Sequence, residues 1–398
     1  MHVMNIMSEL YNKIDGMCNT GIFENRQVYI WGVSKASYIS AQYLLKRNVN
    51  VISVLDNNSG LWGSFSKQLQ NYADMQKMLM IESPEILREN NNVLVLVFSR
   101  AYDSILKQSM SYGIVRENCI HMYSPEKYLD LSDFSGLTEI SVEYRKKLQY
   151  DILKYLKEIC HKYNIRYYLA AGTLLGAVRH KGYIPWDDDI DVYMPWDDYR
   201  RLIELFRDGS GKNDRYSLKY YGLADNFSWI YVKLQDNRTI SRGVRFPLIC
   251  DIGVNIDIFP MGGIPAEERK FKMLEERVSE FQKKWAKHLV NFEMGSDTSV
   301  IAAEINDIMS TYSFESSPYV GYFINGYWNW EKHSKKAYER AIKLQFEDET
   351  FDAPQGYDEV LTHSYGNYME LPPNWQTIQY PHTYKAFWKK GMDEIGQV

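Results

Sequence analysis

Residues 187–191 of this 398-residue chain read Asp-Asp-Asp-Ile-Asp, and the three residues that follow are Val-Tyr-Met. Four carboxylates in five positions repel one another, so a fold that half-buries them needs positive charge close by. Side chains two apart on a strand share a face, so Asp189 and Asp191 are expected to point the same way. Hard divalent cations prefer such oxygen ligands. This acidic run (residues 187–191) therefore predicts a strand with a Mg²⁺ or Mn²⁺ site, with Asp187 and Asp188 as a solvated turn.

A third carboxylate is available further along the chain. Residues 251–260 alternate polar and apolar side chains, as a strand does, and they carry Asp257. It follows Asp191 by 66 residues (257 − 191). If the two strands are neighbours, three carboxylates can surround one or two cations, an arrangement that suits phosphoryl transfer. We therefore predict that Asp257 lies on a strand beside Asp189 and Asp191.

A phosphate-binding end is expected just before the acidic run. The strand predicted over residues 166–171 leads into Gly172 and Thr173, where a helix begins. Free N–H groups at a helix start favour anions. Arg179 and Lys233 are the cations expected to clamp phosphates, although either one alone would more often be a surface charge.

The length predicts two domains. We place an N-terminal Rossmann-like α/β domain at residues 1–125, a linker at 126–140 and a catalytic α+β domain with a mixed sheet and C-terminal helices at 141–398. The first domain shows a strand, a turn at Gly32, a helix and a second strand ending in Asp56. Only the first glycine of a dinucleotide fingerprint is present, which favours a structural or partner-binding role over cofactor binding.

In the second domain, a helix is expected to begin after Ser141 as its N-cap. The C-terminal part of this domain is expected to contain charged amphipathic helices over residues 266–291, 301–309 and 330–344. A tail over 351–373 is expected to follow them.

Composition excludes several classes of protein. A net charge of −5 offers no electrostatic footprint for a nucleic acid partner. The four cysteines form no CxxC pair, which fits a reducing compartment. We see no signal peptide, and no apolar run approaches the roughly 20 residues of a membrane helix. We expect a cytoplasmic protein. Aromatic residues reach 15%; most should fill cores, although such rings also bind quaternary ammonium groups.

The central segment closely resembles the LicD family, which includes fukutin-like proteins. The resemblance rests on residues 172–180 (Gly-Thr-Leu-Leu-Gly-Ala-Val-Arg-His) and 184–191 (Ile-Pro-Trp-Asp-Asp-Asp-Ile-Asp). Segments 233–239, 255–260 and 365–373 resemble further motifs of that family. One departure is Ala170-Ala171, where the family often shows Asp-Gly. The resemblance covers about residues 140 to 375 and leaves the N-terminal domain outside it.

The resemblance implies a nucleotidyltransferase-fold phosphotransferase that acts on glycans. It implies a cytidine-activated donor such as CDP-choline and a glycan or lipid-linked saccharide acceptor, for example in capsule or teichoic acid synthesis. Such an acceptor could bring the protein to the inner face of the membrane. Asp189, Asp191 and Asp257 would hold the metal and perform catalysis. Gly172, Thr173, Arg179 and Lys233 would bind the nucleotide and its phosphates.

Three points stay open from the sequence. The transferred group could instead be aminoethylphosphonate, phosphoethanolamine, glycerol phosphate or ribitol phosphate. The chain could also be a non-catalytic partner in glycan assembly that keeps the fold, although the three intact aspartates argue against this. The acceptor sugar and the oligomeric state are not predicted.

Overall fold

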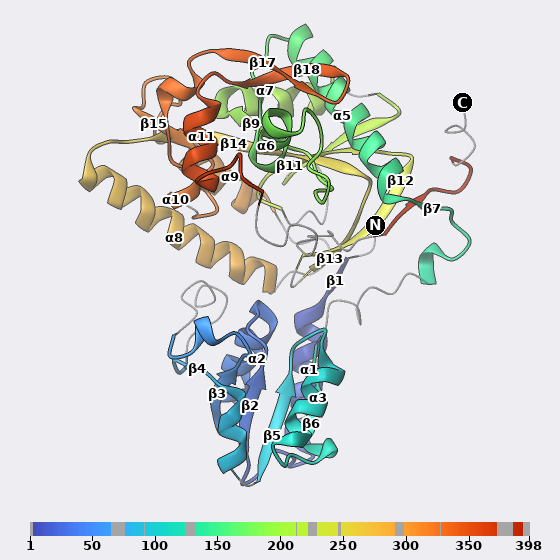
Figure 1. Cartoon of the computed structure of the whole chain (residues 1–398), viewed down its shortest axis with the longest axis vertical. Helices are drawn as coiled ribbons and strands as arrows, with labels where there is room; N and C mark the ends of the chain where they lie inside the picture. The colour runs from blue at the N-terminus through green and yellow to red at the C-terminus, as the bar shows by residue number, and fades with distance from the viewer. Residues whose placement is uncertain are drawn as a thin grey trace. The chain divides into compact units, whose positions relative to one another are not determined.

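The computed structural model describes residues 3–64, 76–90, 92–123, 132–211, 213–221, 229–245, 248–290, 298–326, 328–371 and 385–392 (Figure 1). Contacts divide the chain into two compact units. The first comprises Met1–Asp133, Val244–Ile249 and Lys283–Glu293, and the second Phe134–Gly243, Cys250–Gln282 and Met294–Val398. Residues 126–131 of the predicted linker at 126–140 lie outside the described residues. Its described end holds a 3₁₀ turn, Ser132–Phe134, and the short strand β7, Glu139–Ile140.

The first unit contains a five-stranded parallel sheet in the order β4-β3-β2-β5-β6. Its strands are β2 (Gln27–Trp31), β3 (Val51–Leu55), β4 (Ile81–Glu82), β5 (Val93–Val97) and β6 (Cys119–His121). Its helices are α1 (Ile6–Asn19), α2 (Lys35–Lys46) and α3 (Tyr102–Ser111). Chain order runs outward from β2 to one edge and then from β5 to the other, which is the doubly wound arrangement. The predicted Rossmann-like fold is confirmed.

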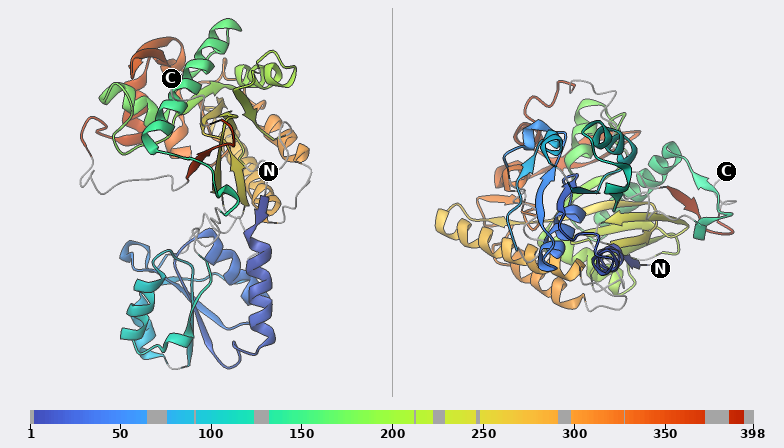
Figure 2. Two further views of the ribbon diagram at one scale, coloured as in Figure 1. Left: turned by 90° about the vertical axis from the view of Figure 1, so that its right-hand side faces the viewer. Right: turned by 90° about the horizontal axis from the view of Figure 1, so that it is seen from below.

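Helices cover both faces of this sheet (Figure 2), and a hydrophobic core lies on each face. Strand alternation sends Val28 and Ile30 to one face, where α1 and α2 pack, and Tyr29 and Trp31 to the other, where α3 packs. Burial on both faces explains why β5 reads as an unbroken apolar run.

The turn after β2 is shaped by backbone packing. Gly32 has φ +107°, and a Cβ there would stand 2.6 Å from the carbonyl oxygen of Phe98. The carboxylate of Asp56, at the end of β3, accepts a hydrogen bond from the Val33 N–H (3.3 Å). In a dinucleotide-binding protein an acid at this position would bind ribose. Here Gly32 and Asp56 both serve the turn itself, which supports the structural interpretation.

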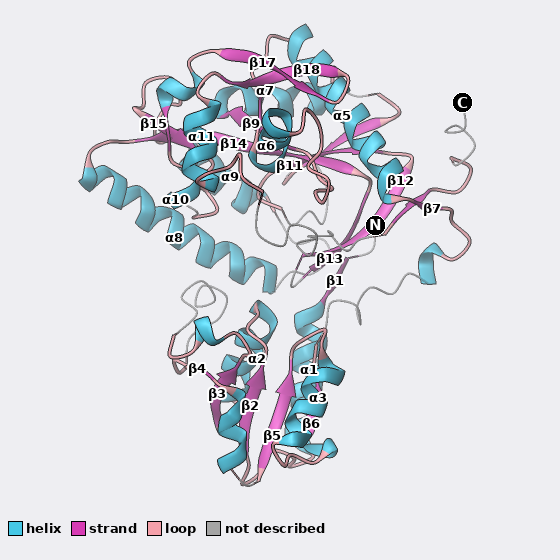
Figure 3. Ribbon diagram, in the orientation of Figure 1, coloured by secondary structure: helices cyan, strands magenta, loops and turns pink. Residues whose placement is uncertain are grey.

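The second unit is built on a seven-stranded mixed sheet (Figure 3). Its strands are β8 (Tyr168–Leu169), β9 (Asp191–Pro195), β10 (Tyr216–Lys219), β11 (Val232–Asp236), β14 (Asn255–Ile264), β15 (Tyr319–Gly321) and β16 (His333–Ser334). β14 is central because it pairs with β11 antiparallel and with β9 parallel. Together with the first unit, this confirms the predicted α/β class with a mixed sheet.

Further strands lie outside this sheet. β12 (Thr239–Arg245), β13 (Leu248–Ile252), β19 (Ala386–Trp388) and β7 belong to another sheet, and β17 (Ala341–Phe346) pairs with β18 (Glu349–Pro354) as a hairpin. The helices of the unit are α5 (Val142–Lys162), α6 (Ala171–Arg179), α7 (Trp196–Arg207), α8 (Glu268–Val290), α9 (Ser299–Met309), α10 (Trp328–Glu331) and α11 (Tyr357–Tyr365). The predicted N-cap is present, because the Ser141 side chain accepts from the Tyr144 N–H. None of the described helices is both long and apolar enough to cross a membrane.

Two local expectations were wrong. The segment 330–344, predicted to be helix, instead contains strand β16, a 3₁₀ turn and the first part of β17. Along β17, exposed and half-buried side chains alternate with period two. The single strand predicted over 251–260 is broken between β13 and β14. A Cβ at Gly253 would stand 2.4 Å from the carbonyl oxygen of Asp236, so the chain there passes directly over the end of β11. The tail expected over residues 351–373 contains most of β18 and all of α11, and its last two residues, 372–373, lie outside the described residues.

Replacing Gly32 with alanine tests whether this turn is structural. The added Cβ would meet a fixed carbonyl in a backbone conformation that alanine avoids, so we expect a loss of about 1–3 kcal/mol of unfolding free energy. Urea denaturation of the full chain, followed by circular dichroism, measures it. Gly113→Ala is the matched control, because it too has positive φ (+93°) but nothing lies within 4 Å of the added atom. Equal losses in both variants would show that close packing at Gly32 is unimportant.

Candidate active site

Strand pairing brings the two distant aspartates together. In the parallel pair β9–β14, Asp257 is the register partner of Asp191, and both side chains are half-buried. The Asp257 N–H donates to the carbonyl of Ile190 (2.9 Å), so backbone pairing begins just before β9. We expected Asp189 to lie on the same strand as Asp191. Instead, Asp189 lies in the loop that leads into β9, two residues before the strand begins. The strand neighbour required for Asp257 is therefore Asp191, with Asp189 two residues upstream.

The start of α6 is tied to the start of β9. The Asp191 N–H donates to the buried Thr173 hydroxyl (2.9 Å), and the Ala170 N–H donates to the Asp191 carbonyl (3.1 Å). Thr173 therefore fixes the position of Asp191, a structural task in addition to the phosphate binding predicted for it. Ala171, the first residue of α6, has φ +43° without being glycine, which marks a strained turn beside the site.

Glycine is required at position 172 because the Asp187 carboxylate leaves no room for a Cβ there. A Cβ at Gly172 would lie 2.4 Å from Oδ2 of Asp187, so this oxygen is packed directly against the first turn of α6. α6 has no side-chain cap at Ala170. The helix start thus already lies against an anionic group, in keeping with the attraction of helix N-termini for negative charge. Asp187, expected to be a solvated turn residue, is half-buried and part of the site.

Asp188 has a different partner. Its carboxylate forms an ion pair with Arg145 of α5, and the two residues are only 5% and 4% exposed. The expectation of a solvated turn is therefore wrong for Asp188 as well. A buried ion pair of this kind holds the acidic run to α5 and removes one carboxylate from metal or substrate binding.

Lys233 lies opposite Asp257 on β11 and forms an ion pair with it. Its ammonium also donates to Oδ1 of Asn255 (3.1 Å). Asp191, Asp257 and Lys233 are successive register partners on β9, β14 and β11, so their side chains share one face of the sheet. We call these three residues the charged rung.

Negative charge converges on Asp191. Burial raises the pKa of its carboxyl well above the ordinary value, and the charges of Asp189, Asp257 and Asp187 raise it further, while Lys233 lowers it. An all-oxygen donor set with this repulsion fits a hard divalent cation. Within the described ranges, no three acidic, histidine or cysteine side chains are placed closely enough to ligate one ion. Asp257 forms its ion pair with Lys233 instead.

Arg179, which was predicted to bind phosphate, forms hydrogen bonds with the C-terminal segment. Its Nη1 donates to the carbonyls of Tyr368 (2.8 Å) and Glu370 (3.2 Å). This brings α11, which contacts α6, close to the acidic cluster. Burial raises the pKa of the Tyr365 hydroxyl, and the charges of Asp191 and Asp187 raise it further. Tyr365 was expected only as part of a motif without a role, and nothing in the spacing could have placed it here.

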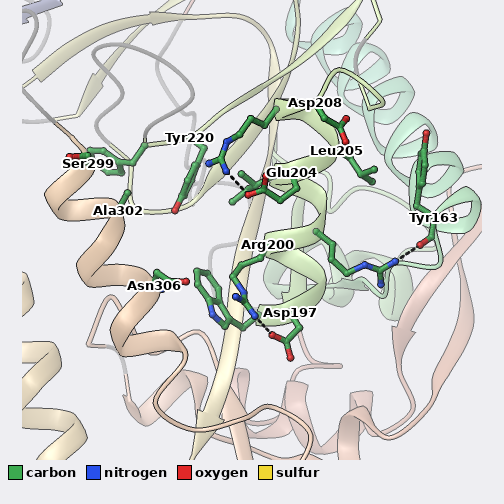
Figure 4. A pocket seen from close by; sticks show the side chains of 15 residues that line it. Tyr163, Asp197, Arg200, Glu204, Leu205, Asp208, Tyr220, Ser299, Ala302 and Asn306 are labelled. Atoms are coloured by element: carbon green, nitrogen blue, oxygen red, sulfur yellow. Dashed lines mark hydrogen bonds and ion pairs between the residues drawn. The ribbon is translucent and has the colours of Figure 1, made fainter.

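A separate cleft lies between α7 and α9 (Figure 4). Its volume is about 920 Å³, and none of the predicted site residues lines it. Its charges are paired along α7, since Arg200 binds Asp197 and Arg207 binds Glu204. With charges that already neutralise one another, this cleft offers less chemistry than the charged rung.

Paired carboxylates on adjacent strands, next to a helix start, define a nucleotidyltransferase-type domain. In agreement, residues 164–298 match the model of the family described as LicD/FKTN/FKRP, nucleotidyltransferase domain. The chain is 31% identical over 253 residues to the lipopolysaccharide cholinephosphotransferase LicD of Haemophilus influenzae, covering 58% of this chain and 92% of that protein. The chain therefore belongs to the LicD family, and it is an enzyme of the phosphotransferase class.

Shorter similarities point to uncharacterized proteins of two Rickettsia species. One from Rickettsia typhi is 41% identical over 85 residues, or 20% of this chain and 27% of that protein. One from Rickettsia prowazekii is 41% identical over 80 residues, or 20% of this chain and 30% of that protein.

Gly172→Ala tests the packing of Asp187 against α6. The new methyl group would displace the Asp187 carboxylate, so we expect a loss of about 1–3 kcal/mol of unfolding free energy and a weakened site. Thermal and urea denaturation measure the stability. Gly16→Ala in α1, with nothing within 4 Å of the added atom, should be neutral or stabilising. A Gly172→Ala protein as stable as the Gly16→Ala protein would contradict the packing described.

Arg145→Met tests the buried ion pair. It removes the guanidinium that balances Asp188, and we expect a loss of about 3–5 kcal/mol of unfolding free energy. The double variant Arg145→Met/Asp188→Leu removes both charges and should regain much of that loss. Urea denaturation of the wild type, of Arg145→Met, of Asp188→Leu and of the double variant gives the coupling between the two sites. If the double variant is as unstable as the sum of the two single changes, the pair is not coupled.

Proposed function

We propose that this enzyme transfers phosphocholine from a cytidine-activated donor, CDP-choline, to a hydroxyl group of a cell-surface glycan or its lipid-linked precursor. The observation that carries the proposal is the pairing of Asp191 with Asp257 on parallel strands beside the start of α6. Family membership supports the kind of reaction, because a relative covered over 92% of its length is named a lipopolysaccharide cholinephosphotransferase.

In this proposal the charged rung faces the donor diphosphate. Asp191 and Asp257, with Asp189 just upstream, would hold Mg²⁺ or Mn²⁺. When bound, such a cation neutralises charge on phosphate oxygens as the phosphoryl group moves. Lys233 lies on the same face and supplies a fixed positive charge. The N–H groups at Gly172 and Thr173 favour phosphate at the helix start.

The step exchanges one P–O bond for another. The acceptor hydroxyl oxygen attacks the phosphorus that carries choline, and the bond from that phosphorus to the bridging oxygen of CMP breaks. CMP leaves with the electron pair, and the hydroxyl proton passes to a carboxylate. We assign this proton acceptor to Asp257, which is half-buried beside Asp191. Arg179 contributes by anchoring the segment that brings Tyr365 to the cluster.

Removing the site carboxylates should abolish transfer. If they hold a catalytic cation, Asp189→Ala and Asp191→Asn are each expected to lower the rate of CMP release from CDP-choline by more than about 10³-fold. The assay includes Mg²⁺ or Mn²⁺, and chelation with EDTA should stop the wild-type reaction.

Asp197→Ala is the matched control, because Asp197 is exposed on α7, where it forms an ion pair with Arg200. It should keep near-normal activity. Near-normal rates in both site variants would contradict the assignment. No CMP release from any cytidine donor, with choline, ethanolamine, glycerol or ribitol as the phosphate substituent, would favour a non-catalytic role in glycan assembly.

A further inference from the structure

An aromatic layer lies next to the charged rung, on β9, on β14 and on the residue that immediately precedes β11. Phe259 follows Asp257 by two residues and is the register partner of Tyr193, which follows Asp191 by two residues. Tyr231 precedes Lys233 by two residues, and its ring centroid lies 4.5 Å from that of Phe259. Since residues two apart on a strand share a face, Tyr231, Phe259 and Tyr193 form a second layer on the face of the charged rung. We call these three residues the aromatic rung.

The two rungs are separated by a distance that suits a short zwitterion. Two residues along a strand span about 6.6 Å. A phosphate at the charged rung would therefore place a positively charged group, attached through two carbons, near the rings of the aromatic rung. Phe259 stands in the middle, with Tyr193 edge-on at 6.1 Å and Tyr322 tilted at 4.9 Å.

These rings already lie beside a cation. The Lys233 ammonium is 5.1 Å from the ring centroid of Trp229 and 5.3 Å from that of Tyr231. Both distances lie within the range of favourable cation–π contact. The ring environment at this end of the sheet is therefore compatible with positive charge. The ring of Phe259 neighbours that of Tyr231 in this environment.

Exposure and charge distinguish Phe259 and Tyr231 from ordinary core. Both are half-buried, whereas Tyr193, the third member of the aromatic rung, is 5% exposed, as is Tyr322, and Trp229 is 8% exposed. Carboxylates lie on two sides: Asp257 and Asp191 one strand step away, and Glu331, which accepts a hydrogen bond from the Tyr193 hydroxyl. A cation is therefore favoured at these rings, and an anion or a neutral polyol is not.

We propose that the aromatic rung, centred on Phe259, binds the quaternary ammonium head of the transferred group and so selects choline over neutral or less methylated substituents. This inference rests on the proposed function for its substrate. It assigns to Phe259 and Tyr231 a role in specificity, separate from the carboxylates that carry the reaction.

Phe259→Leu tests the proposal, since it removes the ring and keeps an apolar side chain. For CDP-choline we expect KM to rise about 10-fold, the size of one cation–π contact. For the neutral analogue, in which a tert-butyl group replaces the trimethylammonium, KM should change less than about 3-fold, and kcat should hold for both donors. Equal loss of both donors, or an unchanged preference for choline, would overturn the proposal.

The matched control is Phe271→Leu. Phe271 on α8 is also half-buried and carries the Lys332 ammonium 4.1 Å from its ring centroid, but it belongs to neither rung. It should leave the choline preference unchanged.

A readout without turnover separates the two proposals. Saturation-transfer NMR with tetramethylammonium chloride should show binding to wild-type protein and weaker binding to Phe259→Leu. Binding without transfer from any donor would sustain the ammonium site and overturn the proposed reaction. Transfer with no difference in tetramethylammonium binding would sustain the reaction and overturn the ammonium site.

Discussion

The parallel pairing of β9 with β14 is the contact on which the active site depends. It sets Asp191 directly beside Asp257, although two carboxylates at adjacent register positions repel each other. Backbone hydrogen bonds and the apolar side chains on the opposite face keep the strands together, with Val192 and Ile258 fully buried. The sheet therefore maintains a repulsion that the side chains alone would relieve by moving apart, and a positively charged group bound beside them would relieve it.

The surrounding structure gives each acid of the run a different partner. Arg145 pairs with Asp188, the first turn of α6 packs against Asp187, and Lys233 pairs with Asp257. Asp191 is left at the point where the remaining negative charges meet. A cluster that looks uniform in the sequence is thus divided into a structural acid, an acid at the helix start and acids that can face a ligand. Like-charged neighbours can coexist here because their environments differ.

Local patterns predicted most of the framework and the strand on which Asp257 lies beside Asp191. The strand at Asp191, the strand at Asp257 and the strand–turn–helix pattern at Gly32 all depend on short-range periodicity, which a sequence displays directly. Partners chosen by tertiary packing were not predictable: Arg145 for Asp188, the carbonyls bound by Arg179, and the position of Tyr365. β16 and the first part of β17 were mistaken for helix because charged and apolar residues are mixed over 330–344. The metal, the donor and the catalytic roles remain predictions.

The hairpin β17–β18 has a consequence for the loop that carries the acidic run. At its turn, the Glu347 N–H donates to the Lys181 carbonyl (2.8 Å), and the Glu347 carboxylate accepts from the Tyr183 N–H (3.0 Å). The Arg145 ion pair holds the other end of the loop at Asp188. Only residues 184–187 run between these two clamps, so the loop has a set length. Evolution can vary its side chains, but an inserted or deleted residue would move Asp189 relative to β9, and the family's central motif would be expected to tolerate substitutions far better than gaps.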